Sequence, residues 1–311
     1  MCSDIPRVLV PLLLFLSPSL AQVSIPRQQT HPEPATVFLR VVATDDQGHP
    51  VRGLTKEQFS IFEKKEQLEI KSFDPTNEPA SVAFVFDVSG SISLKARQLA
   101  TESAYGLAMS GDPSNDYSVV AFNRTAELVC GGGCRGNDLK SALEYVSRIK
   151  PQADTAFYGS CKLAMRHLES SQLKRRVMIV FSDGQDNSST TTFTELRDAL
   201  KESSVTSYAI GLFAGSDIGS SLGLEGKSIL DEFASVSGGK AFYPSNKKEL
   251  QSAMDLVSEE LGNQYVISFV PNARHDHKWH SIKVKVAPPK EKPQTKFPRV
   301  LLRYRESYFD R

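Results

Sequence analysis

The chain reads SVAFVFDVSGSI at residues 81–92, an apolar run that ends in one carboxylate and two hydroxyls at alternate positions. The apolar half predicts a buried strand. The polar half, with Asp87, Ser89 and Ser91, predicts a loop at the carboxyl edge of a sheet. Carboxylate and hydroxyl oxygens are hard ligands, and Mg²⁺ prefers six oxygens that include several waters. The stretch therefore predicts a loop that holds a small divalent cation and leaves a coordination position open.

The composition is that of an ordinary globular protein, with 40% hydrophobic and 23% charged residues among 311. This length accommodates one large domain, or one domain plus a smaller one. The formal charge of +1, from 37 basic and 36 acidic residues, supplies no net field that would attract nucleic acid or an anionic membrane. We therefore expect no nucleic-acid partner.

The first 21 residues are typical of a secretory signal peptide. Arg7 precedes an apolar run from Val8 to Leu16, and Ser-Leu-Ala at 19–21 forms a small-residue cleavage site. The apolar run is about half of the roughly 20 residues that a membrane-spanning helix needs. We expect a secreted, periplasmic or cell-envelope location, with no transmembrane segment in the mature chain.

Removal of the signal peptide leaves three cysteines, Cys130, Cys134 and Cys161, so at most one intrachain disulfide forms. The first two flank three glycines and can close a small ring, but the spacing does not fix the pairing. Zinc binding by these thiols is not expected, because no second cysteine pair or well-spaced histidine accompanies them.

Apolar runs alternate with amphipathic runs between residues 80 and 261, the pattern of a doubly wound, mostly parallel α/β sheet. Strands are expected at 82–86, 117–122, 126–129, 177–181, 206–210 and 240–243, and helices at 92–108, 139–146, 158–168, 193–203, 228–235 and 247–261. Asn137 and Thr192 are the expected start signals of two of these helices.

Both flanks of this region show strand alternation and turn residues instead. We expect the N- and C-terminal flanks to make one small β-sandwich into which the α/β domain is inserted; two separate β-appendages are the alternative. The expected segments are a signal peptide (1–21), a flexible leader (22–36), an N-terminal β-flank (37–79), the α/β domain (80–261) and a C-terminal β-flank (262–311).

Two further oxygen donors are expected at the same edge of the sheet. Thr155 precedes a predicted helix, and Asp183 follows a predicted buried strand. With D-x-S-x-S, Thr and Asp in this order, the chain resembles the von Willebrand factor type A (VWA) family, whose metal-ion-dependent adhesion site (MIDAS) has this pattern. The runs at 53–59 and 304–309 resemble a bacterial, acidobacterial-type subfamily of exported VWA-related proteins.

The resemblance implies a VWA, Rossmann-like fold and a metal site made by Asp87, Ser89, Ser91, Thr155 and Asp183. It implies direct contacts from the two serines, contacts largely through water from the two aspartates, and either kind from Thr155. The implied cofactor is Mg²⁺, with Mn²⁺ or Ca²⁺ as alternatives, and the implied partner is a protein that presents an Asp or Glu carboxylate. The alternative needs no metal: the aspartates cap helices and the hydroxyls satisfy loop amides.

Three further motifs resemble chemical sites but lack the required context. Residues 131–136 satisfy G-x-G-x-x-G, but they follow the third strand of the domain rather than the first, which predicts a simple loop. Residues 219–223 fit G-x-S-x-G, yet they lie in a Gly/Ser-rich stretch that predicts a surface loop over 214–226. In the run at 275–280, side chains alternate so that His280 points away from the other two histidines, which predicts a solvated hairpin tip.

We therefore expect a metal-dependent protein-binding module and not an enzyme, since no histidine lies near Asp87 or Asp183 in the sequence to act as a general base. One alternative is a structural envelope protein whose sandwich mediates assembly and whose metal site is vestigial. The other is a secreted hydrolase that uses Ser221 or a metal-bound water. The sequence does not identify the ligand or the oligomeric state, because binding specificity lies in the loops around the metal.

Overall fold

The computed structural model describes residues 36–310 apart from 76–77, 216–218, 273–275 and 289–298. The predicted signal peptide, and the predicted leader up to residue 35, lie outside these residues. Within the described part of the chain, no helix combines the length and the apolar character needed to cross a bilayer.

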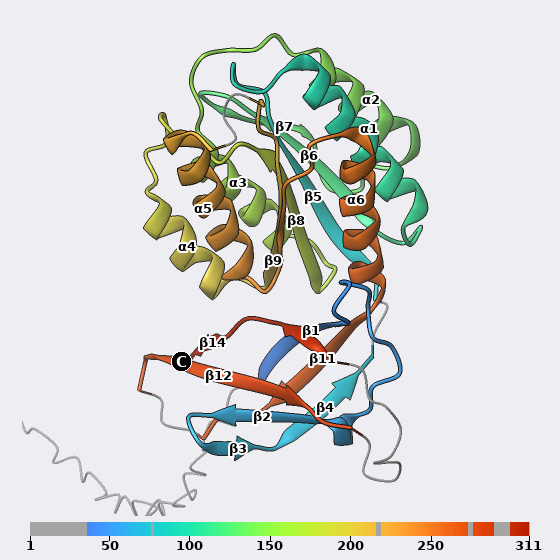
Figure 1. The fold of residues 1–311 in the computed structure, drawn as a ribbon, viewed down its shortest axis with the longest axis vertical. Helices are drawn as coiled ribbons and strands as arrows, with labels where there is room; N and C mark the ends of the chain where they lie inside the picture. The colour runs from blue at the N-terminus through green and yellow to red at the C-terminus, as the bar shows by residue number, and fades with distance from the viewer. Residues whose placement is uncertain (1–35, 76–77, 216–218, 273–275, 289–298, 311) are drawn as a thin grey trace, which may run out of the picture. The chain divides into compact units, whose positions relative to one another are not determined.

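A six-stranded sheet runs through the α/β domain in the order β10-β9-β8-β5-β6-β7 (Figure 1). The strands are β5 (Ala80–Asp87), β6 (Asp116–Phe122), β7 (Ala126–Cys130), β8 (Arg175–Ser182), β9 (Val205–Gly211) and β10 (Ala241–Phe242). All neighbours are parallel except β6 and β7. Every residue of the central strand β5 is buried, because helices cover both faces of the sheet. The predicted, mostly parallel α/β fold is confirmed.

Helices form a layer on each face of this sheet (Figure 1). One layer contains α1 (Leu94–Ser110), α2 (Gly136–Arg148) and α6 (Lys247–Gly262), and the other contains α3 (Phe157–Glu169), α4 (Phe193–Glu202) and α5 (Ser221–Ser235). Each layer encloses its own apolar cluster with one face of the strands. In the first of these clusters Phe86 of β5 stacks on Phe181 of β8, with ring centroids 4.7 Å apart. These contacts fix the ends of the two strands that carry the predicted metal ligands.

Helix α4 starts where the sequence predicts, whereas α2 and α5 start earlier than predicted. Thr192 caps α4 as predicted, in a reciprocal capping box with Glu195. Helix α2 begins at Gly136, ahead of the predicted start signal. Helix α5 begins at Ser221, so the predicted surface loop is wrong from this residue onward. The Ser220 hydroxyl accepts a hydrogen bond from the Gly223 amide and starts the helix despite its glycines.

The flanks form two four-stranded antiparallel sheets around a common apolar core. One sheet has the order β13-β1-β11-β4, and the other has the order β14-β12-β2-β3. The strands are β1 (Val37–Thr44), β2 (Phe59–Glu63), β3 (Glu66–Leu68), β4 (Ile70–Asp74), β11 (Gln264–Phe269), β12 (Trp279–Val286), β13 (Leu301–Arg303) and β14 (Ser307–Phe309), with a short 3₁₀ helix η1 (Lys56–Gln58) before β2. Both sheets combine strands from the two ends of the chain, so the predicted sandwich made by the flanks is confirmed.

The α/β domain is inserted between neighbouring strands of one sheet. The chain leaves the sandwich after β4 and returns through β11, and these two strands pair with each other. Ile267 on β11 lies opposite Phe73 of β4 on one side and Leu39 of β1 on the other. Consequently the two connections to the inserted domain start side by side.

The sequence did not fix the cysteine pairing; in the structure a disulfide joins Cys130, at the end of β7, to Cys134. Cys161 on α3 is buried and is not disulfide-bonded. Most of the G-x-G-x-x-G run lies in the predicted loop between β7 and α2, and its first three glycines lie inside the disulfide ring; its last residue, Gly136, begins α2.

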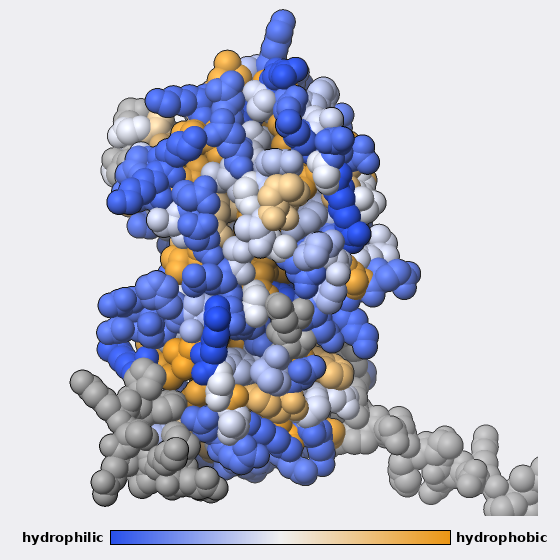
Figure 2. Space-filling model, turned by 90° about the vertical axis from the view of Figure 1, so that its right-hand side faces the viewer, coloured by the Kyte–Doolittle hydropathy of each residue, from blue (hydrophilic) through white to orange (hydrophobic). Residues whose placement is uncertain are grey.

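Figure 2 shows the side that lies on the right in Figure 1, where α1, α2 and α6 cover the sheet. Hydrophilic side chains predominate over this helical layer, and its apolar side chains are scattered in small groups. This is the surface expected of amphipathic helices that bury one face and hydrate the other.

Candidate metal centre

Asp87 is the last residue of β5, and it is 1% exposed. Its Oδ1 accepts a hydrogen bond from the Ser89 amide at 2.9 Å, and its Oδ2 accepts one from the Ser182 hydroxyl at 2.7 Å. Burial, together with the negative charge of Asp183, raises the pKa of Asp87 to about 6. No cationic side chain among the described residues lies within ion-pair distance of Asp87. The carboxylate is therefore buried without a direct counter-charge.

The two serines follow on the loop from β5 to α1. Ser89 is buried and Ser91 is exposed, and their hydroxyl oxygens lie 3.1 Å apart. Ser89 also forms an isolated parallel bridge with Gln152, in the segment before α3. This bridge brings the first predicted ligand loop next to the segment that carries the second.

Thr155 is buried in the loop before α3 and is tied to the loop that follows β8. Its amide donates to Asn187 Oδ1 at 2.8 Å, and its carbonyl accepts hydrogen bonds from the amides of Asn187 and Ser188 at 2.9 and 3.1 Å. The second and third ligand loops are therefore joined by three hydrogen bonds.

Asp183 is the first residue after β8, and its Oδ1 accepts a hydrogen bond from the Gln185 amide at 3.1 Å. The turn is completed by Gly184, whose φ of +80° is in the left-handed region that favours glycine. Helix α5 packs directly on this turn, because a Cβ added at Gly226 would lie 2.1 Å from the Asp183 carbonyl oxygen. The position of Asp183 thus depends on a glycine in α5.

The structure gathers the loops of all five predicted residues at the carboxyl edge of the central strands. Asp87, Ser89 and Ser91 belong to the first loop, Thr155 to the second and Asp183 to the third. The hydrogen bond from Ser182 to Asp87, the Ser89 bridge and the Asn187 contacts connect these loops with one another. The donors are all carboxylate or hydroxyl oxygens, the set that suits Mg²⁺, Mn²⁺ or Ca²⁺.

Two residues that support this centre are not among the site residues predicted from the sequence. Arg97 of α1 is fully buried, and its guanidinium donates to the Ile149 carbonyl. Burial lowers its pKa, and the charge of Asp87 offsets part of that shift. Arg97 lies on the buried face of α1, one turn before Ala100. This helical spacing from a predicted buried residue could have indicated that Arg97 is buried. Asp186 accepts hydrogen bonds from the Tyr158 and Ser189 amides and thereby anchors the start of α3.

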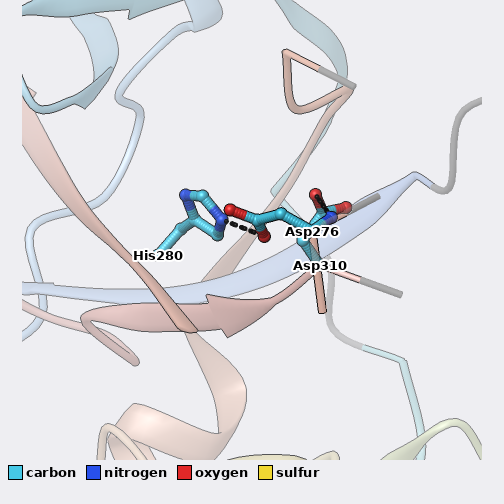
Figure 3. A group of neighbouring side chains, drawn as sticks. All are labelled: Asp276, His280 and Asp310. Atoms are coloured by element: carbon cyan, nitrogen blue, oxygen red, sulfur yellow. Dashed lines mark hydrogen bonds and ion pairs between the residues drawn. The ribbon is translucent and has the colours of Figure 1, made fainter. Parts of the chain in front are cut away.

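A second group of polar side chains lies in the sandwich, and it corrects a prediction. His280 is 8% exposed on β12, and its ring hydrogen-bonds Glu63. The ring also hydrogen-bonds Asp276 (Figure 3). The predicted solvated hairpin tip is therefore wrong for His280, because the alternation argument did not include Glu63 on the neighbouring strand β2. His275 of the same run lies outside the described residues.

The von Willebrand factor type A domain model matches residues 81–256, which is more than half of the chain. The chain therefore belongs to the von Willebrand factor type A family. Domains of this family typically bind a divalent cation at a MIDAS and mediate protein–protein interactions.

Several solved structures are similar to the chain at low sequence identity. PilB minor pilin from Streptococcus sanguinis is 14% identical over 61% of this chain and 63% of that chain, with a TM-score of 0.48. Proximal thread matrix protein 1 from the mussel byssus, with a zinc-occupied MIDAS motif, is 21% identical over 64% of this chain and 49% of that chain, with a TM-score of 0.49. A von Willebrand factor type A protein from Catenulispora acidiphila is 12% identical over 91% of this chain and 74% of that chain, with a TM-score of 0.49. The sequence matches none of the curated proteins with which it was compared.

Proposed function

We propose that this chain is an exported protein-binding module of adhesion type, which captures an acidic side chain of a partner protein through a bound divalent cation. The proposed ligands are Asp87, Ser89, Ser91, Thr155 and Asp183, and the proposed ion is Mg²⁺, with Mn²⁺ or Ca²⁺ as alternatives. One observation carries the proposal: the buried Asp87 carboxylate, whose pKa is raised by burial and by the charge of Asp183, lies next to a loop with two serine hydroxyls 3.1 Å apart.

The residues present fit a dication in both charge and chemistry. A cation between two carboxylates cancels their mutual repulsion and so stabilises both in the charged form. The hydroxyls add oxygen ligands without adding charge. When bound, the ion supplies an electrophilic position that an acidic oxygen from outside can fill. Asp87 and Asp183 are the anionic residues among the five proposed ligands, so the ion keeps much of its attraction for a third carboxylate.

The surface beside this centre favours a protein as the ligand of the bound cation, rather than a small free anion. Leu222 and Leu224, in the first turn of α5, are large apolar residues that are more than half exposed. The Leu222 carbonyl accepts a hydrogen bond from the Gln185 side chain, two residues beyond Asp183. An acidic partner side chain at the ion would therefore be flanked by apolar contact area, as the centres of protein interfaces are.

The proposal includes export and a place in the bacterial subfamily of exported VWA-related proteins. Support for export comes from the signal-peptide pattern at 1–21. Support for the subfamily comes from the runs at 53–59 and 304–309, which in the structure lead into β2 and form β14. The proposal assigns no reaction to the site. Ser221, the serine of the G-x-S-x-G motif, is the first residue of helix α5 and directly follows the N-cap residue Ser220.

Capture of a partner is expected to require both the cation and Asp87. Immobilised full chain is incubated with an extract of the native cell envelope in Mg²⁺ or in EDTA, as wild type, as Asp87→Asn and as Asp198→Asn, a matched control on the exposed face of α4. We expect one partner to be retained by wild type and control in Mg²⁺, lost in EDTA, and absent from Asp87→Asn. Retention in EDTA by all three forms would instead support an assembly protein with a vestigial metal site.

A further inference from the structure

We propose that Asp276, His280 and Asp310 form a second metal site, in the β-sandwich, that takes a divalent ion of the Zn²⁺ type. The ligand atoms that these three side chains offer all lie within 4.8 Å of one another, and Figure 3 shows the Asp276 carboxylate next to the His280 ring, with Asp310 beside Asp276. Asp276 precedes β12, His280 lies on it, and Asp310 follows β14. The pairing of β12 with β14 holds the three residues together, because Trp279 lies opposite Phe309 and His280 opposite Tyr308.

The ring of His280 is oriented as in a metal-bound histidine. Nδ1 lies 2.8 Å from Glu63 Oε1, and Glu63 is itself buried and accepts a hydrogen bond from the Tyr308 hydroxyl at 2.9 Å. The ring also stacks on Tyr308, with centroids 5.4 Å apart. Histidine ligands commonly donate their other ring N–H to a carboxylate in this way, which fixes the tautomer and raises the basicity of the ligating nitrogen. In this chain Nε2 is the nitrogen left to face Asp276, at 2.9 Å.

Asp310 is an independent indication that a cation belongs here. It is 5% exposed, and among the described residues its carboxylate accepts one hydrogen bond, a long one of 3.3 Å from the Asp276 amide. No cationic side chain of the described part of the chain forms an ion pair with it. A buried carboxylate is costly without a compensating charge, and this one faces a second carboxylate and an imidazole. A metal ion close to all three groups would reduce this cost.

The donor set selects the kind of ion. One imidazole nitrogen and two carboxylate oxygens suit Zn²⁺, whereas Mg²⁺ and Ca²⁺ prefer oxygen ligands throughout. At Zn–ligand distances of about 2.1 Å, neighbouring ligands of a tetrahedral ion lie about 3.4 Å apart. The 2.9 Å distance between His280 Nε2 and Asp276 Oδ1 would lengthen slightly. Ligand atoms as far apart as 4.8 Å would move together by little more than 1 Å, which side-chain rotation can provide. Three protein ligands leave a fourth position for water.

An ion at this point would tie together segments that are far apart in sequence. Asp310 is joined to the β12 side by one backbone hydrogen bond, from its amide to the Lys278 carbonyl at 3.0 Å. A metal ion bound by Asp310, His280 and Asp276 would add to this bond and to the long hydrogen bond that the Asp276 amide donates to the Asp310 carboxylate. The site would thus fasten the strand β14 to the sheet.

The test is zinc binding by the full chain in an Asp87→Asn background, which removes the proposed Mg²⁺ centre. Competition against a chromogenic chelator gives the number of Zn²⁺ ions and their affinity, and the absorption spectrum of bound Co²⁺ reports nitrogen and oxygen ligands. We expect one tight Zn²⁺ per chain in this background, and at least a 100-fold loss of affinity on adding Asp276→Asn and Asp310→Asn. The exposed His277→Gln is the matched control and should bind as the background does.

A further variant separates ligation from a purely structural effect. Glu63→Gln keeps the size of the side chain but weakens the acceptor of His280 Nδ1, so Zn²⁺ affinity should fall 10- to 100-fold with a changed Co²⁺ spectrum. Circular dichroism checks that each variant is folded in chelator; should the double variant fail this check, Asp310→Asn alone replaces it. Zn²⁺ binding unchanged by the aspartate variants, or no tight Zn²⁺ in the background, would overturn the proposal whatever happens at the Mg²⁺ centre.

Discussion

Asp87→Asn is expected to make the metal-free protein more stable than wild type and to abolish any further gain from Mg²⁺. The amide keeps the size of the carboxylate and can still accept the hydrogen bond from the Ser89 amide. It removes the buried charge that Asp183 repels. Wild type should gain about 2.7 kcal/mol when Mg²⁺ is present at 100 times its dissociation constant, because the ion binds the folded state alone. Urea unfolding at pH 8, in EDTA and in Mg²⁺, measures both effects.

The metal-free part of this prediction has a defined pH dependence. The pKa of Asp87 is raised from 3.8 to about 6 on folding, so between these values the folded state binds more protons than the unfolded state. Stability contributed by this group is therefore present below about pH 4 and is lost as the pH rises through 6. The loss corresponds to roughly 3 kcal/mol, from about 1.4 kcal/mol for each pH unit between the two pKa values. In EDTA, the advantage of Asp87→Asn should shrink toward zero as the pH is lowered to 4.

Asp198→Asn is the control, since Asp198 is a half-exposed carboxylate whose ion pairs with Arg197 and Lys201 are at the surface. Such pairs contribute little to stability. The control should therefore follow wild type in both EDTA and Mg²⁺. A stabilisation by Mg²⁺ that survives in Asp87→Asn would show that the ion binds somewhere else.

Gly226→Ala is expected to destabilise the α/β domain and to weaken Mg²⁺ binding, although alanine favours helices. The new methyl group would lie 2.1 Å from the Asp183 carbonyl oxygen, far inside van der Waals contact, so either α5 or the turn with Asp183 must move. Overpacking of this kind costs about 1–3 kcal/mol. Mg²⁺ affinity should fall as well, because the displaced residue is a proposed ligand. Urea unfolding and isothermal titration with Mg²⁺ measure the two losses.

Gly106→Ala provides the matched helical control. Nothing lies within 4 Å of a Cβ added at Gly106 in α1, so the substitution should stabilise the protein by about 0.5–1 kcal/mol. Equal effects of the two substitutions would mean that α5 does not press on the metal loop. Opposite signs would confirm that Gly226 is required for the position of Asp183.

The α/β fold could be predicted from sequence because its strands are covered on both faces. Residues 82–86 and 177–181 are continuous apolar runs, and each lies inside an observed strand, β5 and β8. The helical periodicity between them was clear for the same reason, since each helix buries one face. Burial against many neighbours leaves a strong local pattern.

Features that depend on a single distant partner were not predictable in this way. The start of α5 was missed because glycines at 219, 223 and 226 are typical of loops, yet Gly226 is needed where the helix meets Asp183. The burial of His280 was missed because its partner Glu63 lies 217 residues earlier in the chain. At the candidate metal centre, D-x-S-x-S marked the loop, whereas the contact of Thr155 with Asn187 required the folded structure.

The pairing of β4 with β11 has a consequence for the order of events during synthesis on the ribosome. Within the N-terminal flank, the strand pair formed is β2 with β3; β1 and β4 pair with strands that follow the α/β domain. Until those later strands emerge, β1 and β4 present unsatisfied edges that can pair with other chains. Folding of the α/β domain would bring its two ends together and so remove most of the loop-closure entropy that opposes the last pairing. Folding of the inserted domain would in this way promote correct pairing of the sandwich strands and shorten the time for which their edges are exposed.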